Sequence, residues 1–180
     1  MKRFVSVVVL LLGLCSVAWS QNRSYTVDDL LKVRRVNDPQ LSPDGRHVAF
    51  TIGDVSFADN RVVNQIYVTP AGGGELKRLT DGKSSSSAPL WSPDGKKLAF
   101  YRFDESKVPD FYLATGLTRI QDSLDVEAYP KPGVSNPIVD LLVYDVDTKK
   151  TTRIDVRDGK PFDNVSIGHY VFRIDWAPSG

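Results

Sequence analysis

The chain has 180 residues, with 23 Lys and Arg against 22 Asp and Glu, and its formal net charge is +1 at pH 7. This balance argues against a broad basic surface of the kind that holds nucleic acid electrostatically. The chain has one cysteine, which excludes an internal disulfide framework.

Residues 1–20 have the pattern of a secretory signal peptide. A basic start, Lys2-Arg3, precedes an apolar run over 4–14, and small residues at 18 and 20 suit cleavage after Ser20. The run is short for a membrane span, and no stop-transfer pattern follows it. We therefore expect an exported protein, periplasmic or secreted. A retained anchor and a lipid on Cys15 are the alternatives.

Residues 21–36 predict an N-terminal segment with one short helix. Thr26 and Asp29 are spaced as in a capping box, in which a Thr hydroxyl and an acidic side chain satisfy backbone N–H groups of the first turn. Leu30, Leu31 and Val33 then give a helix of about two turns an apolar face.

Downstream of this segment the sequence predicts β structure. Short runs rich in β-branched and aromatic residues alternate with clusters of Gly, Pro, Asn and Asp, as expected for strands joined by turns. The predicted fold class is therefore all-β. The predicted strands cover residues 48–50, 65–68, 77–79, 98–101, 141–144 and 151–154.

One sequence occurs twice and begins a third time. LSPDGRHVAF at 41–50 returns as WSPDGKKLAF at 91–100, and WAPSG at 176–180 starts it again. In each Ser-Pro-Asp-Gly tetrad, Pro presets the first corner of a type I turn, Asp tolerates the second, and Gly takes the positive φ that returns the chain to a strand. A repeated turn-and-strand unit is typical of stacked or radial β folds, because one unit cannot bury its apolar face alone.

We therefore predict a partial β-propeller. The repeats predict two blades and the start of a third. Complete propellers have about four to eight blades, so we expect this chain to be part of a longer protein. Trp91 and Trp176 occupy one position of the repeat, and we expect both to fill space between neighbouring blades. The propeller covers 37–180, with blades at 37–82 and 84–159, a long insertion in the second blade, and the start of the next blade at 165–180.

The insertion carries two irregular motifs. They are FDESKVP at 103–109 and YPKPGVSNP at 129–137, and VYDV follows at 143–146. In this order and spacing, and with the preceding Trp-Ser-Pro-Asp-Gly turn, they resemble the N-terminal propeller of the dipeptidyl peptidase IV group, in the prolyl oligopeptidase (S9) clan of serine peptidases. The resemblance covers 84–180, and residues 26–82 resemble the propellers of the clan more generally.

The resemblance implies a propeller that restricts access to short peptides, helps to hold their amino terminus, and caps a C-terminal α/β-hydrolase domain of the same protein. The parent protein would be a serine-type peptidase, either a dipeptidyl peptidase or an oligopeptidase, with no cofactor. In that group a glutamate pair shortly before the Trp-Ser-Pro turn holds the amino terminus. Residues 79–88 contain no such pair here.

Four residues of the insertion are candidates for substrate binding. The carboxylates of Asp104 and Glu105 can attract or bind a cationic amino terminus, and Tyr112 and Tyr129 can line the route of a peptide. In the alternative interpretation the two carboxylates are solvated or shape the loop before Pro109, because charged side chains are usually exposed. The two tyrosines then pack the insertion onto the blade.

The sequence identifies no catalytic residues in this chain. The triad of this clan needs a Ser within Gly-x-Ser-x-Gly, followed by Asp and His, and this pentapeptide does not occur. The serines at 84–87 predict a polar linker. His47, which we expect to face away from the core, and His169 are predicted to be structural, and no ligand spacing predicts a metal site. The glycines at 72–74 predict a turn rather than a phosphate loop.

The sequence therefore predicts the propeller of an exported S9 peptidase, which gates and positions short peptides for a hydrolase domain that this chain does not contain. The alternative is a non-catalytic, TolB-like propeller that presents its loops to protein partners. The insertion favours the peptidase. A homo-oligomer is compatible with both, and nucleic acid is not an expected partner.

Overall fold

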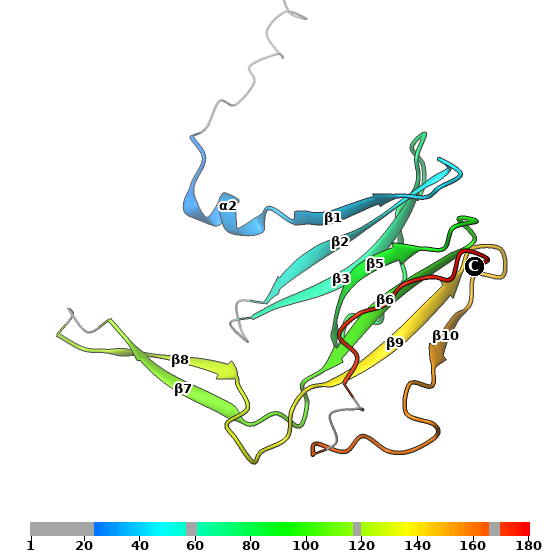
Figure 1. The fold of residues 1–180 in the computed structure, drawn as a ribbon. Helices are drawn as coiled ribbons and strands as arrows, with labels where there is room; N and C mark the ends of the chain where they lie inside the picture. Colours follow the sequence, from blue (N-terminus) through cyan, green and yellow to red (C-terminus); the bar gives the residue numbers. More distant parts are fainter. Residues whose placement is uncertain (1–23, 57–60, 117–119, 166–169) are drawn as a thin grey trace, which may run out of the picture. The chain divides into compact units, whose positions relative to one another are not determined.

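The computed structural model describes residues 24–56, 61–116, 120–165 and 170–180 (Figure 1). Its contacts divide the chain into two units, residues 1–33 and 34–180, which are described separately. The predicted signal peptide at 1–20 lies outside the described residues, as does His169. In the described part of the chain, no helix is long and apolar enough to cross a membrane.

In the first unit the predicted helix is confirmed as α2 (Val27–Lys32). Thr26 is its N-cap: the Thr26 hydroxyl accepts the Asp29 N–H at 3.3 Å, and the Asp29 carboxylate accepts the Thr26 N–H at 3.0 Å. This reciprocal pair satisfies two backbone donors that have no partner inside the helix. The helix buries none of its residues, so its apolar face remains exposed.

The second unit consists of antiparallel strands, which confirms the all-β class and the partial propeller. Two sheets have four strands each, in the orders β1-β2-β3-β4 and β10-β9-β6-β5, and they lie side by side in Figure 1. In the first sheet, neighbouring strands follow one another along the chain, as in propeller blades, and in the second only the β7–β8 pair comes between the neighbours β6 and β9. Each predicted strand overlaps an observed one. The first sheet contains β1 (Arg35–Leu41), β2 (His47–Ser56), β3 (Arg61–Pro70) and β4 (Lys77–Arg78). The second contains β5 (Ser85–Trp91), β6 (Lys97–Asp104), β9 (Ile138–Asp145) and β10 (Thr151–Ile154).

The insertion forms a hairpin between β6 and β9. Its strands, β7 (Asp110–Thr115) and β8 (Ser123–Ala128), pair only with each other, and most of their side chains are exposed. Beyond β10, residues 155–165 and 170–180 contain no strand. The Gly180 N–H donates to the Ala177 carbonyl oxygen at 2.9 Å, which closes a turn at the third copy of the repeat.

The two Ser-Pro-Asp-Gly turns have the same hydrogen bonds. Each Asp carboxylate accepts the hydroxyl of the Ser two residues earlier at 2.6 Å and the N–H two residues later at 3.0 or 3.1 Å. The Gly that follows has a φ of 70° in both copies, as the turn requires. The hydrogen bonds from Ser42 and Ser92 hold the pKa of Asp44 and Asp94 below the usual range. The prediction of two equivalent turns is confirmed.

The repeat begins earlier than the sequence comparison indicated. Asp38 and Ala88 occupy equivalent positions and have positive φ values of 49° and 54°. The pairing of β1 with β2, and of β5 with β6, shifts its register at these residues. The first strand of each sheet, β1 or β5, therefore carries the same β-bulge, which bends the strand just before the repeated turn.

The prediction of a polar linker at 84–87 is wrong, because three of these serines belong to β5. Ser86 is fully buried. The Ser85 hydroxyl accepts the Asn64 N–H from β3 at 3.1 Å. Serine side chains in contact with the neighbouring sheet give the strand no apolar alternation, so its sequence did not predict it.

The core lies between the two sheets, and tryptophans tie the repeat units together. The Trp91 indole N–H donates to the Gln40 carbonyl oxygen at 2.9 Å, and the Trp176 indole N–H donates to the equivalent Leu90 carbonyl oxygen at 3.1 Å. The prediction that both tryptophans lie between units of the repeat is confirmed. The buried core residues are Ala49, Ile66 and Val68 of the first sheet and Trp91, Leu98, Phe100 and Tyr144 of the second.

The prediction that His47 faces away from the core is wrong. Its ring lies 6.2 Å from the Trp91 ring, and its Nδ1 is buried without a hydrogen-bond partner in the described part of the chain. Side chains alternate between the two faces of a strand, so His47 shares the face of Ala49, which is fully buried. Because both faces of β2 are covered, the apolar neighbours of His47 did not identify the core face.

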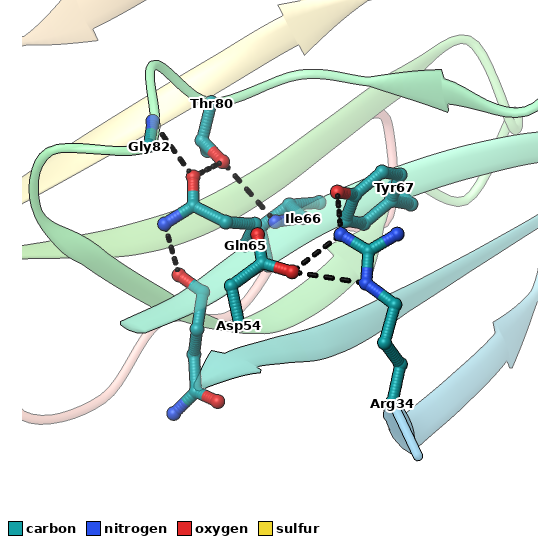
Figure 2. Close-up of polar contacts among 8 residues, drawn as sticks. Arg34, Asp54, Gln65, Ile66, Tyr67, Thr80 and Gly82 are labelled. Carbon is teal, nitrogen blue, oxygen red and sulfur yellow. Dashed lines mark hydrogen bonds and ion pairs between the residues drawn. The ribbon is translucent and has the colours of Figure 1, made fainter. Parts of the chain in front are cut away.

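A polar cluster fixes the start of β1 on the first sheet (Figure 2). Arg34 donates to Asp54 from Nε at 3.0 Å and again from its terminal nitrogen, which also donates to the Tyr67 hydroxyl at 3.2 Å. These bonds join the residue before β1 to both β2 and β3. The Arg34 guanidinium also lies 5.9 Å from the centre of the Tyr67 ring, a favourable cation–π distance.

Candidate functional site

A cavity of about 650 Å³ lies where four parts of the second unit meet. These are the start of β3, the connection from β4 to β5, the end of β6 with the loop that follows it, and the open ends of the β7–β8 hairpin. The start of β3 lies beside the start of β5, where the Asn64 N–H bonds to Ser85. Because β5 and β6 are antiparallel, β6 ends at this same place. The volume is within the range of small-ligand sites. It is lined by Arg61, Val62, Val63, Lys83, Ser84, Ser85, Phe103, Asp104, Glu105, Ser106, Val108, Asp110, Val126, Glu127 and Ala128.

Gln65, a fully buried residue of β3, lies behind one wall of this cavity, and Figure 2 shows its contacts with Thr80 and Gly82. Its Oε1 accepts the Thr80 hydroxyl at 2.5 Å and the Gly82 N–H at 2.9 Å, and its Nε2 donates to the Ser84 carbonyl oxygen at 3.1 Å. Nε2 also donates to the Asn64 carbonyl oxygen at 2.8 Å. All four hydrogen-bonding positions of the amide are therefore used. They fix the loop that presents Lys83, Ser84 and Ser85 to the cavity.

The two predicted carboxylates lie together in the cavity wall, but their surroundings differ. Asp104 Oδ1 accepts the Ser106 N–H at 3.0 Å. Hydrogen bonds from the hydroxyl and N–H of Ser106 lower the pKa of Asp104. Asp104 therefore accepts a backbone hydrogen bond within the loop that follows β6. Glu105 is exposed, and in the described part of the chain its carboxylate has no hydrogen-bond or ion-pair partner.

Sequence reasoning missed two further carboxylates, Asp110 and Glu127, which also line the cavity. They belong to the two strands of the hairpin, where Asp110 pairs with Ala128 and Phe111 with Glu127. Among the described residues that line the cavity, four carboxylates outnumber two cations, Arg61 and Lys83. The register of the two β-rich runs of the insertion was the signal that could have placed these residues beside Asp104 and Glu105.

Tyr112 and Tyr129 are not brought to the cavity. Each is 60% exposed, and neither is among the lining residues. The Tyr129 ring lies 5.7 Å from the Phe111 ring, and the Lys131 ammonium lies 4.9 Å from the centre of the same Phe111 ring. Tyr129 thus packs within the insertion.

The Asn-Pro motif that ends the insertion has a structural role. Both the N–H and the side-chain amide of Asn136 donate to Asn164 Oδ1 at 2.9 Å, and the amide also donates to the Tyr170 hydroxyl at 2.7 Å. The Asn164 amide donates back to the Val134 carbonyl oxygen at 2.7 Å. These bonds fasten the end of the insertion to the segment that follows β10.

The described residues contain no group of three or more His, Cys, Asp or Glu side chains placed to hold a metal ion. Gly73 closes a turn by donating to the Pro70 carbonyl oxygen at 3.0 Å, so the glycines at 72–74 form the predicted turn. The excess of carboxylates among the described lining residues of the cavity attracts a cationic ligand.

Two antiparallel sheets lie side by side, and each has its own copy of the same turn, the same β-bulge and the same contact with a tryptophan. This repetition defines the region as part of a β-propeller. The chain belongs to the family described as Dipeptidyl peptidase IV (DPP IV) N-terminal region, whose model matches residues 15–180. The resemblance found in the sequence is thereby confirmed.

Known relatives of the chain are peptidases by name. Dipeptidyl-peptidase 5 of Porphyromonas endodontalis is 26% identical over 172 residues, or 88% of this chain and 24% of that protein. A probable dipeptidyl-aminopeptidase B of Neosartorya fischeri is 34% identical over 109 residues, or 54% of this chain and 11% of that protein. The chain therefore spans about a quarter or less of these relatives.

A solved structure supports the fold. The crystal structure of Porphyromonas gingivalis dipeptidyl peptidase 4 is similar with a TM-score of 0.54 and 29% identity. The similarity covers 73% of this chain and 19% of that one.

Proposed function

We propose that this region is the propeller of an exported serine peptidase of the dipeptidyl peptidase type, and that it admits short peptides to a C-terminal α/β-hydrolase domain of the same protein. The family match and the names of the relatives support this assignment. The basic, apolar and small residues of the first twenty positions support export. Hydrolysis is assigned to residues outside this chain, since it contains no Gly-x-Ser-x-Gly sequence.

Within this function, the acidic cavity receives the amino terminus of the peptide. The α-amino group of a peptide has a pKa of about 7.7–8.0, so it is mostly cationic at pH 7. The excess of carboxylates in the lining favours a cation. The observation that carries the proposal is Glu105, which reaches the cavity with its carboxylate uncommitted to any described residue, so that it can accept a charge-assisted hydrogen bond.

The test is kinetic and uses the full-length protein with Glu105→Gln. Loss of a hydrogen bond between two charged groups costs about 1.5 kcal/mol, so KM for a dipeptide nitroanilide with a free amino group should rise about tenfold with little change in kcat. Glu75→Gln is the matched control, because Glu75 is exposed in the turn between β3 and β4 and does not line the cavity.

Two results would contradict the proposal at different levels. Equal KM values for wild type and Glu105→Gln would remove Glu105 as the ligand of the amino group while leaving the peptidase assignment intact. A full-length protein that hydrolyses no peptide substrate, and whose sequence continues only with further propeller repeats, would overturn the peptidase assignment in favour of the TolB-like alternative.

A further inference from the structure

One carboxylate of the second sheet is surrounded by three arginines. Asp140 on β9 is 3% exposed and forms ion pairs with Arg102 at 2.6 Å, Arg153 at 2.7 Å and Arg157 at 3.4 Å. The side chain of Arg157 is itself only 4% exposed. The peptidase assignment makes no use of this cluster.

The sheet and the chain that follows it place these residues. Arg102 on β6 is the cross-strand partner of Asp140, and Arg153 lies on β10, the next strand across the sheet. Arg157 comes from the loop after β10. That loop turns back because the Lys160 N–H donates to the Arg157 carbonyl oxygen at 3.0 Å. The Arg157 guanidinium also donates to the Val139 carbonyl oxygen.

The charges of this cluster do not balance. One carboxylate faces three guanidinium groups, of which Arg157 is buried with Asp140, whereas the side chains of Arg102 and Arg153 are 33% and 58% exposed. Asp155 adds a second negative charge beside the cluster, and its oxygens accept the backbone N–H groups of Arg157 at 2.9 Å and of Gly159 at 2.6 Å. In the described part of the chain, the Nε atoms of Arg102 and Arg157 are buried with no hydrogen-bond partner.

A hollow of about 240 Å³ adjoins the cluster on the side of β10. Arg153, Arg157 and Lys160 line it, and Asp155 is the one carboxylate among the described residues of the lining. Asp158 belongs to the same loop but does not line the hollow. Since one water occupies about 30 Å³ of liquid volume, the hollow can hold a small anion with part of its hydration shell.

We propose that this hollow is a binding site for a small oxyanion, either a carboxylate or a tetrahedral phosphate-like group. Guanidinium groups bind such oxygens through paired N–H donors. An anion bound between Arg153 and Lys160 supplies the negative charge that Asp140 alone does not. The site lies on β10 and its loop, which share no residue with the acidic cavity, so the inference stands independently of the proposed function.

The first experiment measures binding of inorganic phosphate to the full-length protein by isothermal titration calorimetry at fixed ionic strength. We expect saturable binding with a Kd in the millimolar range or tighter, and a loss of about tenfold in affinity for Arg153→Met and for Lys160→Met. Both side chains are exposed, so these variants should fold even where Arg157→Met does not.

Lys150→Met is the matched control, because Lys150 is an exposed lysine in the turn before β10 and does not line the hollow. Its affinity for phosphate should equal that of the wild type. No saturable binding up to about 10 mM phosphate would overturn the proposal. Equal affinity in the wild type, Arg153→Met and Lys160→Met would also overturn it.

A second arm separates the two sources of the oxyanion. A short peptide with a free C-terminal carboxylate is compared with its C-terminal amide as a competitor of phosphate. Competition by the acid but not by the amide assigns the site to a peptide carboxylate, and competition by neither assigns it to a phosphate-like anion. Equal competition by both would show that the carboxylate group is not recognised, and would overturn the carboxylate half of the proposal.

Discussion

The indole of Trp91 donates a hydrogen bond to the backbone oxygen of Gln40 and so fastens the second sheet to β1 of the first. Trp176 makes the same bond to Leu90, one repeat further along the chain. In both cases, the tryptophan just before a repeated turn therefore donates to the first strand of the preceding unit, β1 or β5.

Trp91→Phe should lower the free energy of unfolding by about 2 kcal/mol, because it removes a buried hydrogen bond and part of a buried ring. Trp91 is 7% exposed. Urea unfolding followed by circular dichroism measures the loss. Trp176 is only half-buried, so Trp176→Phe is the control and should cost less. Equal losses in the two variants would contradict the packing described here.

The repeated turns should make stability depend on pH in the acid range. Folding lowers the pKa of Asp94, so its contribution is complete above the unfolded pKa of about 3.9 and is lost as the pH falls through the lower, folded value. The stability difference between the wild type and Asp94→Asn should therefore be largest near neutral pH and shrink below about pH 4.

Unfolding of both proteins in urea between about pH 3 and 7 measures this dependence. Asp147→Asn, in the turn after β9, is a control outside the repeated turns. A difference that stays constant across the range would show that the Ser–Asp hydrogen bonds do not stabilise the turns through the ionised carboxylate.

Gln65→Met should destabilise the protein by about 3 kcal/mol, because it leaves buried partners of the amide without hydrogen bonds. The loss should be local first: the Gly82 amide, which donates to Gln65, should exchange with solvent faster. Hydrogen exchange measured by mass spectrometry tests this. Thr80→Val removes only one of these partners and should cost about 1 kcal/mol. Unchanged exchange at Gly82 in Gln65→Met would contradict the role given to Gln65.

Asp140→Asn should be among the most damaging single changes, at about 3–5 kcal/mol, because it leaves the buried guanidinium group of Arg157 without its counter-charge. Arg153→Met removes an ion-pair partner whose side chain is 58% exposed, and should cost at most about 1 kcal/mol. Thermal unfolding of the two variants gives the comparison. Similar losses in both would show that Asp140 is not the centre of the cluster.

Local patterns predicted those parts of the fold that depend on neighbouring residues. The capping box of α2, the two equivalent turns and the strands rich in β-branched residues all form where expected. The strand β5 was missed because its serines contact another sheet rather than water. The orientation of His47 was missed because both faces of β2 are covered.

The site was predicted only in part for a similar reason. Asp104 ends β6 and Glu105 follows it, and both could be found from the motif that contains them. Asp110 and Glu127 are 17 positions apart in the sequence and reach the cavity only through the register of the β7–β8 hairpin. The role of Gln65 could not be read from the sequence, because it depends on contacts with Gly82 and Ser84 in the connection from β4 to β5.

The most direct test of this account is a crystal structure of the full-length protein with a bound, uncleaved peptide that has a free amino group. The account predicts the peptide's ammonium group inside the acidic cavity, within about 3 Å of the Glu105 carboxylate. An ammonium group held by other residues, with the cavity occupied only by solvent, would contradict it.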